Sequence, residues 1–215
     1  AEDVQNWILQ KSGTFDNQAA QDAASTLQDW NNKGYMPEGV NAVDASTALS
    51  RFCNGEGLFF PSGNWNLDTV AKALGDDVQF FAFPGATSED EPNVAANAGA
   101  FYGIPVNAKN RDAAAAFLDY TQSAEAQQII VDNSGYLPKS STLDLKANSA
   151  LQQSMFDAYA DVLTSGHTSD FINNATAGMQ SSGLIPNFQL LLDNSITPQE
   201  FTKNVQAQYD KEAKR

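Results

Sequence analysis

The sequence predicts an α/β fold that is rich in helices and has few strands. Helical periodicity, bounded by capping residues, recurs along most of the chain. Strand-like apolar runs are confined to residues 57–60, 78–83 and 99–106. The 215 residues, 42% of them hydrophobic, suffice for one large core or two small ones.

The first half of the chain predicts three helices with strands between and after them. Residues 16–33 carry an apolar stripe at helical spacing, with Asp16 as the expected N-cap and Gly34 ending the helix. Residues 46–52 and 67–74 predict two shorter helices. The first two strand-like runs follow these two short helices.

The second half predicts mainly helices. They are expected at residues 110–120, 124–132, 151–164, 171–193 and 197–213. Ser123 is the expected N-cap of the second of these helices, and Gly135 its end. Thr197, Pro198 and Glu200 form the pattern of a capping box with proline in the first helical position.

The charge of the chain restricts its partners. Twelve Lys and Arg face 26 Asp and Glu, a formal net charge of −14. Such a field repels nucleic acid and anionic lipid, so neither is expected as a partner, whereas it suits a polar, uncharged ligand. The acidic start at residues 1–4 is unlike a signal peptide, so a mature, trimmed or partial chain is expected.

No metal or cofactor is predicted. Cys53 is the single cysteine and is expected to be a small buried residue, since the single histidine, His167, is far away in the sequence. The acidic stretch 88–93 lacks the spacing of calcium ligands and reads as a solvated turn. Phosphate-binding loops and nucleophile elbows are also missing from the sequence.

Residues 51–65 are the most informative segment. A helix ends there, an apolar run follows, and a turn at Pro61-Ser62-Gly63 delivers Trp65 between Asn64 and Asn66. An aromatic face beside amide groups is suited to a neutral, polar and partly apolar ligand.

The order of motifs along the chain resembles the carbohydrate-type extracellular solute-binding proteins of ABC importers, the maltodextrin-binding-like group. The motifs are F-x-N-G at 52–55, G-x-W at 63–65, F-P at 83–84, a glycine-rich run at 99–104, N-x-x-A-A-x-x-F-L at 110–118, S-x-E-x-Q at 123–127, G-x-x-P at 135–138 and T-P-x-E-F at 197–201. Each motif alone is weak, but their common order covers nearly the whole chain.

The resemblance implies a two-lobed α/β protein with a type II periplasmic-binding-protein-like fold, which closes on a sugar or oligosaccharide by hinge motion. Such proteins deliver the ligand to an ABC permease and do no chemistry on it. An extracellular or periplasmic location is implied, with membrane anchoring through an N-terminal lipid signal that the sequence does not contain.

Relatives of this kind are longer, so the chain is expected to be mainly the C-terminal lobe. Residues 1–96 and 146–215 would belong to that lobe, and residues 97–145 would cross the hinge into the N-terminal lobe. Without the rest of its lobe, segment 97–145 is expected to repack or to form a non-native dimer with a second chain.

Trp65 is the first candidate for ligand contact, because it matches the tryptophan of the family's G-x-W and would lie across a sugar ring. A core or lobe-edge tryptophan is the alternative. Asn64 is the candidate partner of a sugar hydroxyl, and an amide that only stabilises the turn is its alternative.

The resemblance supplies four further candidates. Gly99 and Tyr102 match the glycine-rich strand near the hinge, where small residues let a ligand approach the backbone. Phe101 points to the other side of that strand and is expected in the core. Phe171 and Asn174 lie in the segment where relatives place an aromatic residue of the cleft, although the usual tandem aromatics are missing here.

Two other functions remain open. A carbohydrate-active enzyme would need two carboxylates facing each other across a cleft, whereas Asp76-Asp77 and residues 89–91 lie in turns away from aromatic and amide groups. A sensing or adhesion module on the same fold would have a partner domain, or no ligand at all.

Overall fold

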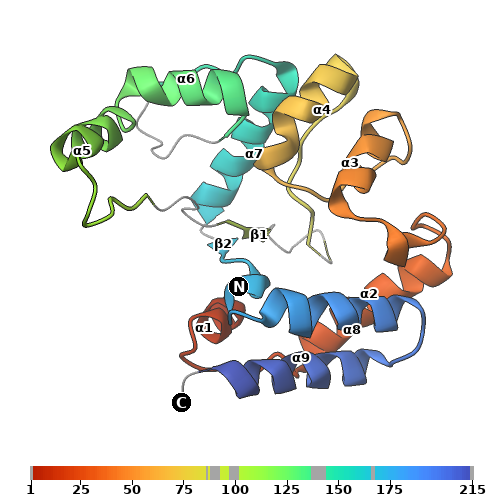
Figure 1. The fold of residues 1–215 in the computed structure, drawn as a ribbon. Helices are drawn as coiled ribbons and strands as arrows, with labels where there is room; N and C mark the ends of the chain where they lie inside the picture. Colours follow the sequence, from red (N-terminus) through yellow and green to blue (C-terminus); the bar gives the residue numbers. More distant parts are fainter. Residues whose placement is uncertain are drawn as a thin grey trace. The chain divides into compact units, whose positions relative to one another are not determined.

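The structure, a computed structural model, describes residues 2–85, 87, 93–96, 102–136, 144–165 and 168–213. It confirms the prediction of a helix-rich chain with few strands (Figure 1). Strand β1 (Val94–Ala95) pairs in parallel with β2 (Thr168–Ser169). The chain divides into two compact units. Unit 1 comprises residues 1–43, 93–97 and 167–215, and unit 2 comprises residues 44–92 and 98–166.

Unit 1 is a helical unit around one core. Its helices and turns are α1 (Glu2–Ile8), α2 (Gln18–Asn32), the 3-10 turns η1 (Val40–Ala42) and η4 (Ile172–Asn174), the π-helix η5 (Met179–Leu184), α8 (Ile185–Leu192) and α9 (Pro198–Glu212). Helices α2, α8 and α9 pack against one another, and η5 packs against α8 and α9 (Figure 1).

The core of unit 1 centres on Trp7, which is 2% exposed. Its indole stacks on the ring of Tyr209 with 4.6 Å between centroids, and its Nε1 donates to Gln206 Oε1 at 3.1 Å. The Tyr209 hydroxyl donates to the Trp7 carbonyl at 2.9 Å. The sequence indicates that Trp7 lies on a helix and packs inward, but it identifies no partner for it, because the residues that hold Trp7 are about 200 positions away in the chain.

The capping box at the start of α9 is confirmed. The Glu200 N–H donates to Thr197 Oγ1 at 3.2 Å, and the Thr197 N–H donates to Glu200 Oε2 at 2.8 Å. These bonds, led by that of the Thr197 backbone, lower the pKa of Glu200.

The predicted N-cap of α2 is wrong by one residue. Asn17, not Asp16, caps the helix and accepts from the Ala20 N–H at 3.0 Å. Asp16 instead accepts from the buried Thr202 hydroxyl of α9 at 2.8 Å. A buried hydroxyl without a hydrogen-bond partner costs more free energy than an uncapped, exposed helix end. The Asp16 carboxylate therefore binds Thr202 and joins α9 to the start of α2.

Unit 2 is organised around α4. Its helices and turns are α3 (Ala45–Cys53), η2 (Asn64–Asn66), α4 (Leu67–Leu74), η3 (Gly75–Asp77), α5 (Arg111–Tyr120), α6 (Ala124–Ser134) and α7 (Ala150–Ser165). Helix α4 packs against α3, α6 and α7. The buried core is small, and its members are Leu67, Val70, Leu151 and Met155, with Cys53 partly buried beside them.

The predicted ends of α6 are confirmed. The Ala126 N–H donates to the Ser123 hydroxyl, and Gly135 ends the helix with a φ of 68°. A side chain at Gly135 would come within 3.0 Å of Leu67 at the start of α4. Glycine therefore serves both the left-handed turn and the close approach of α6 to α4.

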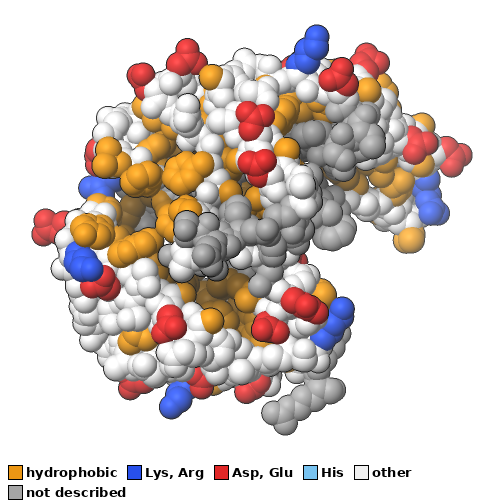
Figure 2. Space-filling view, turned by 180° about the vertical axis from the view of Figure 1, so that it is seen from behind, with side chains coloured by type: hydrophobic (Ala, Val, Ile, Leu, Met, Phe, Trp, Pro, Cys, Tyr) orange, Lys and Arg blue, Asp and Glu red, His pale blue; other side chains and the backbone are white. Residues whose placement is uncertain are grey.

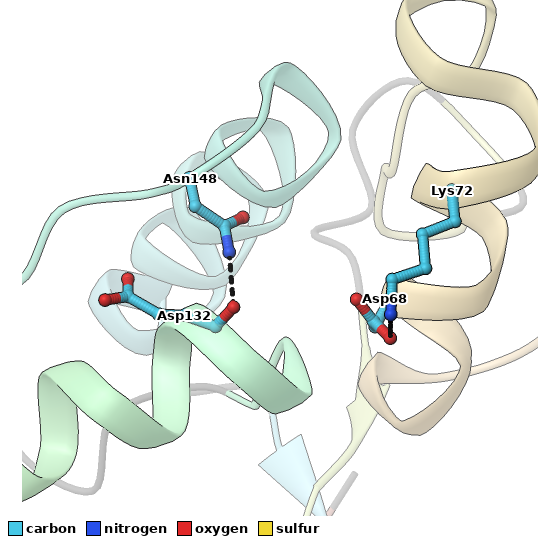
Figure 3. A network of polar contacts seen from close by, with 4 residues as sticks. All are labelled: Asp68, Lys72, Asp132 and Asn148. Atoms are coloured by element: carbon cyan, nitrogen blue, oxygen red, sulfur yellow. Dashed lines mark hydrogen bonds and ion pairs between the residues drawn. The ribbon is translucent and has the colours of Figure 1, made fainter.

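Hydrogen bonds connect α6 to α7, and an ion pair lies within α4. Asn148, just before α7, donates to the carbonyl of Asp132 in α6 at 2.8 Å, while Lys72 pairs with Asp68 within α4 at 2.7 Å (Figure 3). Buried Gln152 of α7 adds a bond to the Val131 carbonyl of α6 at 2.9 Å. The end of α6 is thereby fixed to the start of α7.

The predicted strands at 57–60 and 78–83 are wrong, since neither segment joins a strand pair in the described part of the chain. One face of each segment packs inward. Phe60 stacks on Phe52 with 5.3 Å between centroids, and the Phe80 N–H donates to the Ser154 hydroxyl at 2.9 Å. An apolar run becomes a strand only when a neighbouring strand exchanges backbone hydrogen bonds with it, and the described residues supply no such strand beside either segment. Of the third predicted strand, residues 99–101 lie outside the described residues, and 102–106 have no regular structure.

Candidate ligand-binding site

The turn before α4 fixes the direction of Trp65. The Asn66 N–H donates to the Gly63 carbonyl at 3.2 Å, which closes the 3-10 turn η2, and Asn66 Nδ2 donates to the Ser62 hydroxyl at 2.9 Å. The six-membered ring of Trp65 lies over Gly63. A Cβ at that position would be 2.8 Å from Cε3 of the indole and closer still to Cζ3 and Cη2.

Gly63 is therefore required for space rather than for backbone freedom. Its φ of −138° is open to any residue. Because Gly63 has no side chain, the indole of Trp65 has room to fold back and pack against the turn.

The indole is also accessible, because Trp65 remains 52% exposed. Trp65 is therefore not a core residue, and a tryptophan at the edge of a lobe is the alternative to ligand contact. An exposed aromatic face in a fixed orientation can cover the apolar C–H face of a ring-shaped ligand.

Asn64 lies beside the indole in the same turn and is partly exposed. The Asn64 carbonyl accepts from the Leu67 N–H, which connects η2 to α4. Among the described residues, the amide that stabilises the turn through its side chain is that of Asn66, and no side-chain hydrogen bond holds Asn64 there. This arrangement leaves the Asn64 amide able to donate to a ligand and to accept from it.

The other candidates come from other segments of the chain. Tyr102 is exposed in unit 2, while Gly99, like Phe101 and His167, lies outside the described residues. Phe171 and Asn174 belong to unit 1, where both bind Asp170. The Phe171 N–H donates to Asp170 Oδ1 at 2.7 Å, and Asn174 Nδ2 donates to the same oxygen at 2.9 Å.

Residues 2–157 match the sequence model of a family described as bacterial extracellular solute-binding protein. The chain belongs to this family of extracellular solute-binding proteins. A solved structure titled "Chitin oligosaccharide binding protein" matches this solute-binding protein with a TM-score of 0.79 and 18% sequence identity. The match covers 99% of this chain and 53% of that one, so the chain spans about half the length of the solved structure. No curated protein sequence matches the chain.

The family model confirms the predicted resemblance at the level of an extracellular solute-binding protein, and the structural match confirms the fold class. At 18% identity the structural match speaks for the fold alone. The structure shows two compact units. The predicted division into two lobes, with residues 97–145 crossing between them, is a separate statement and stays a prediction.

Sequence reasoning missed an apolar surface on unit 2 of this solute-binding protein. Leu58 and Phe59 are 89% and 73% exposed, and Phe81 and Phe83 are also exposed. The Phe59 and Phe81 rings meet edge to face with 6.2 Å between centroids. Figure 2 shows hydrophobic side chains grouped at the surface of the part that carries α3.

The signal for this surface was in the alternation of the two apolar runs. Phe60 and Phe80 face inward, whereas Phe59 and Phe81 face outward, as the two-residue period of an extended chain requires. Reading both runs simply as apolar strands hid that period.

The described residues hold no group of three or more His, Cys, Asp or Glu that could bind a metal ion. Within the same residues, no helix is both long and apolar enough to cross a membrane. The candidate site itself consists of the exposed face of Trp65 and the amide of Asn64, which suit a neutral molecule.

Proposed function

We propose that this chain is part of the substrate-binding component of an ABC importer, which binds a sugar or oligosaccharide outside the cell and delivers it to permease subunits in the membrane. Its family is extracellular and binds solutes, and the matching solved structure is titled a chitin oligosaccharide binding protein. The observation that carries the proposal is the indole of Trp65, packed on Gly63 and half exposed beside Asn64.

In this proposal the Trp65 ring covers the C–H face of one sugar unit, and Asn64 exchanges hydrogen bonds with its hydroxyls. The net charge of −14 favours an uncharged ligand over an acidic one. Gly99, Tyr102, Phe171 and Asn174 remain proposed contacts from the resemblance. Asp170 holds the side chain of Asn174 and the backbone of Phe171, which supports a defined position for that pair.

We infer binding without catalysis. Glycoside hydrolysis needs two carboxyl groups on either side of the scissile bond. The turn that carries Trp65, residues 61–66, contains no carboxylate. Lipid anchoring of the protein outside the cell is part of the same proposal and rests on the resemblance.

Helix α5 supports the prediction that segment 97–145 associates with other polypeptide. None of the described residues of α5 is buried, and Phe117 and Tyr120 on it are exposed. A helix of ten residues is marginal alone in water, so it gains stability from a partner surface. Light scattering of this 215-residue chain over a range of concentrations tests for a dimer, and a monomer at all of them would remove it.

The proposed function is tested by calorimetric titration of the full-length natural protein with chitin oligosaccharides, maltodextrins and monosaccharides. We expect a dissociation constant of about 1 μM or lower, near −8 kcal/mol, for at least one oligosaccharide. Chromatography of the same samples should return the ligand intact. Release of a shorter product would identify an enzyme instead, and a panel without any binding would favour a sensing or adhesion module.

A further inference from the structure

A pocket lies in unit 1, whereas the turn that carries Trp65 belongs to unit 2. The pocket has a volume of about 430 Å³ and is formed where residues 34–41, which follow α2, meet the end of α8. Ligand pockets generally have volumes of about 300–1,000 Å³. Its size is therefore sufficient for a small organic molecule or a single side chain of a partner.

Two glycines and three side-chain amides define the wall of the pocket. Gly34 and Gly39 have φ angles of 74° and 70°, which glycine adopts without strain, and they set the course of the loop. Asn41 Nδ2 donates to the Gln189 carbonyl of α8 at 2.9 Å, and Gln189 Nε2 donates back to the Asn41 carbonyl at 3.2 Å. Asn31 Nδ2 donates to the Leu192 carbonyl at 2.7 Å. The wall is thus tied to α8 from both α2 and the loop.

These bonds also decide the polarity of the pocket. Since the amide nitrogens of Asn31 and Asn41 bind α8, their Oδ1 atoms are left as acceptors. The other polar side chains in the lining are the carboxylates of Glu38 and Asp193. Asp193 Oδ1 accepts a hydrogen bond from the Ser195 N–H at 2.9 Å, which leaves Oδ2 as a further acceptor.

No basic side chain is among the lining residues. The nearest lysine in sequence, Lys33, pairs with Asp29 at 2.6 Å, and the hydrogen bond and charge of Asp29 raise the pKa of Lys33. The pocket therefore combines two carboxylates and two amide oxygens without a competing cation of its own.

The remaining lining is apolar. Met36, Pro37, Val40 and Leu192 contribute side chains without hydrogen-bonding groups. Acceptors beside such a surface match a molecule with N–H donors and a positive charge at the end of a short hydrocarbon stem. Anions are repelled, and two carboxylates are too few to hold a metal ion tightly.

We propose that this pocket binds an organic cation, namely an aliphatic ammonium or guanidinium group on an apolar stem. The group comes either from a free amine or from a lysine or arginine side chain of a partner protein. The carboxylates attract the charge, and the stem covers the apolar lining. The proposal is independent of the sugar site, because Trp65 and Asn64 lie in unit 2.

Titration of the 15N-labelled chain with n-butylammonium and n-butylguanidinium, followed by NMR, tests this directly. Exposed carboxylates each contribute little, so we expect a dissociation constant on the order of 1 mM, with amide shifts confined to residues 31–41 and 189–195. n-Butanol, which has the same stem without the charge, should bind at least tenfold more weakly. Equal binding of the alcohol, or shifts spread over the chain, would overturn the proposal.

Two variants remove the charges without changing side-chain size. Glu38→Gln and Asp193→Asn should each weaken n-butylammonium binding at least threefold. The matched control is Asp22→Asn on α2, where Asp22 accepts from Gln18 Nε2 outside the pocket. An equal loss in the control would reduce the effect to overall charge and contradict a local site.

A blocked tripeptide, acetyl-Gly-Lys-Gly-amide, distinguishes the two sources of the cation. Tighter binding of the peptide than of n-butylammonium would identify a partner's side chain, and tighter binding of the free amine would identify a small ligand. Either result supports the site. Failure of both probes in the wild-type chain, with its spectrum still that of a folded protein, would remove it and leave the sugar proposal untouched.

Discussion

Unit 1 and unit 2 differ in how completely each covers its own apolar side chains. Unit 1 buries Trp7 and Tyr209 together with Phe201 and Leu191 in one core, and polar bonds reach into it from α1, α2 and α9. Unit 2 has a core cluster of four buried side chains and leaves several aromatic residues exposed, Trp65 and Phe59 among them. The contrast teaches that the aromatic residues buried in unit 1 stabilise the fold, whereas those exposed in unit 2 can contact a ligand or another polypeptide.

The largest expected effect tests the first half of this contrast. Trp7→Ala should lower the free energy of unfolding by about 3–5 kcal/mol, because it empties the centre of the core and leaves Gln206 without its indole donor. Urea denaturation followed by circular dichroism measures the loss. Tyr35→Ala, which changes an exposed aromatic of unit 1, is the control and should stay within about 0.5 kcal/mol. A Trp7→Ala chain as stable as the wild type would contradict the assigned core.

The next effect concerns the placement of the indole in unit 2. Gly63→Ala should displace the Trp65 ring, because the new Cβ would overlap it, and sugar affinity should fall about tenfold, or 1.4 kcal/mol. Tryptophan fluorescence and calorimetry report the two changes. Unchanged affinity in Gly63→Ala would mean that the ring position does not matter.

A smaller effect is expected at the capping box of unit 1. Thr197→Ala should cost about 1 kcal/mol of stability, because the Glu200 N–H loses its acceptor. The Glu200 carboxylate adds a pH dependence. Its folded pKa lies below the ordinary value of 4.5, so its contribution is present above pH 4.5 and disappears as the pH falls through the lowered pKa.

This pH dependence is measured by comparing the wild type with Glu200→Gln in denaturation series between pH 3 and pH 7. The difference in stability should be present at neutral pH and should shrink on acidification. A difference that grows toward low pH would contradict the sign.

The smallest effect tests the second half of the contrast. Phe59→Ser should change the stability of the chain by less than about 0.5 kcal/mol, because the side chain is already exposed. It should also raise solubility, since the apolar surface becomes smaller. Static light scattering and thermal unfolding check both. A large destabilisation would show that Phe59 is part of a core.

Local signals were sufficient for much of the fold. Ser123, Gly135 and the capping box of Thr197 were readable because each acts on a backbone group a few residues away. Trp7 and Asp16 were not, because their partners Tyr209 and Thr202 lie at the other end of the chain. An isolated sequence gives no information on which distant side chain competes for such a group.

The two misassigned strands illustrate the same limit. Their apolar character was correct and is seen in Phe60 and Phe80, but a strand also needs a neighbour that the sequence run does not specify. In the candidate site, the turn and the direction of Trp65 follow from local residues. The role of Gly63 as space for the indole required coordinates.

Titration of the full-length protein and its Trp65→Ala variant with the best-binding oligosaccharide tests the central claim most directly. The claim is that the exposed indole of unit 2 binds sugar. We expect at least a tenfold weaker affinity, about 1.4 kcal/mol, with the unfolding transition unchanged. The same affinity in the variant and the wild type would contradict this account of Trp65.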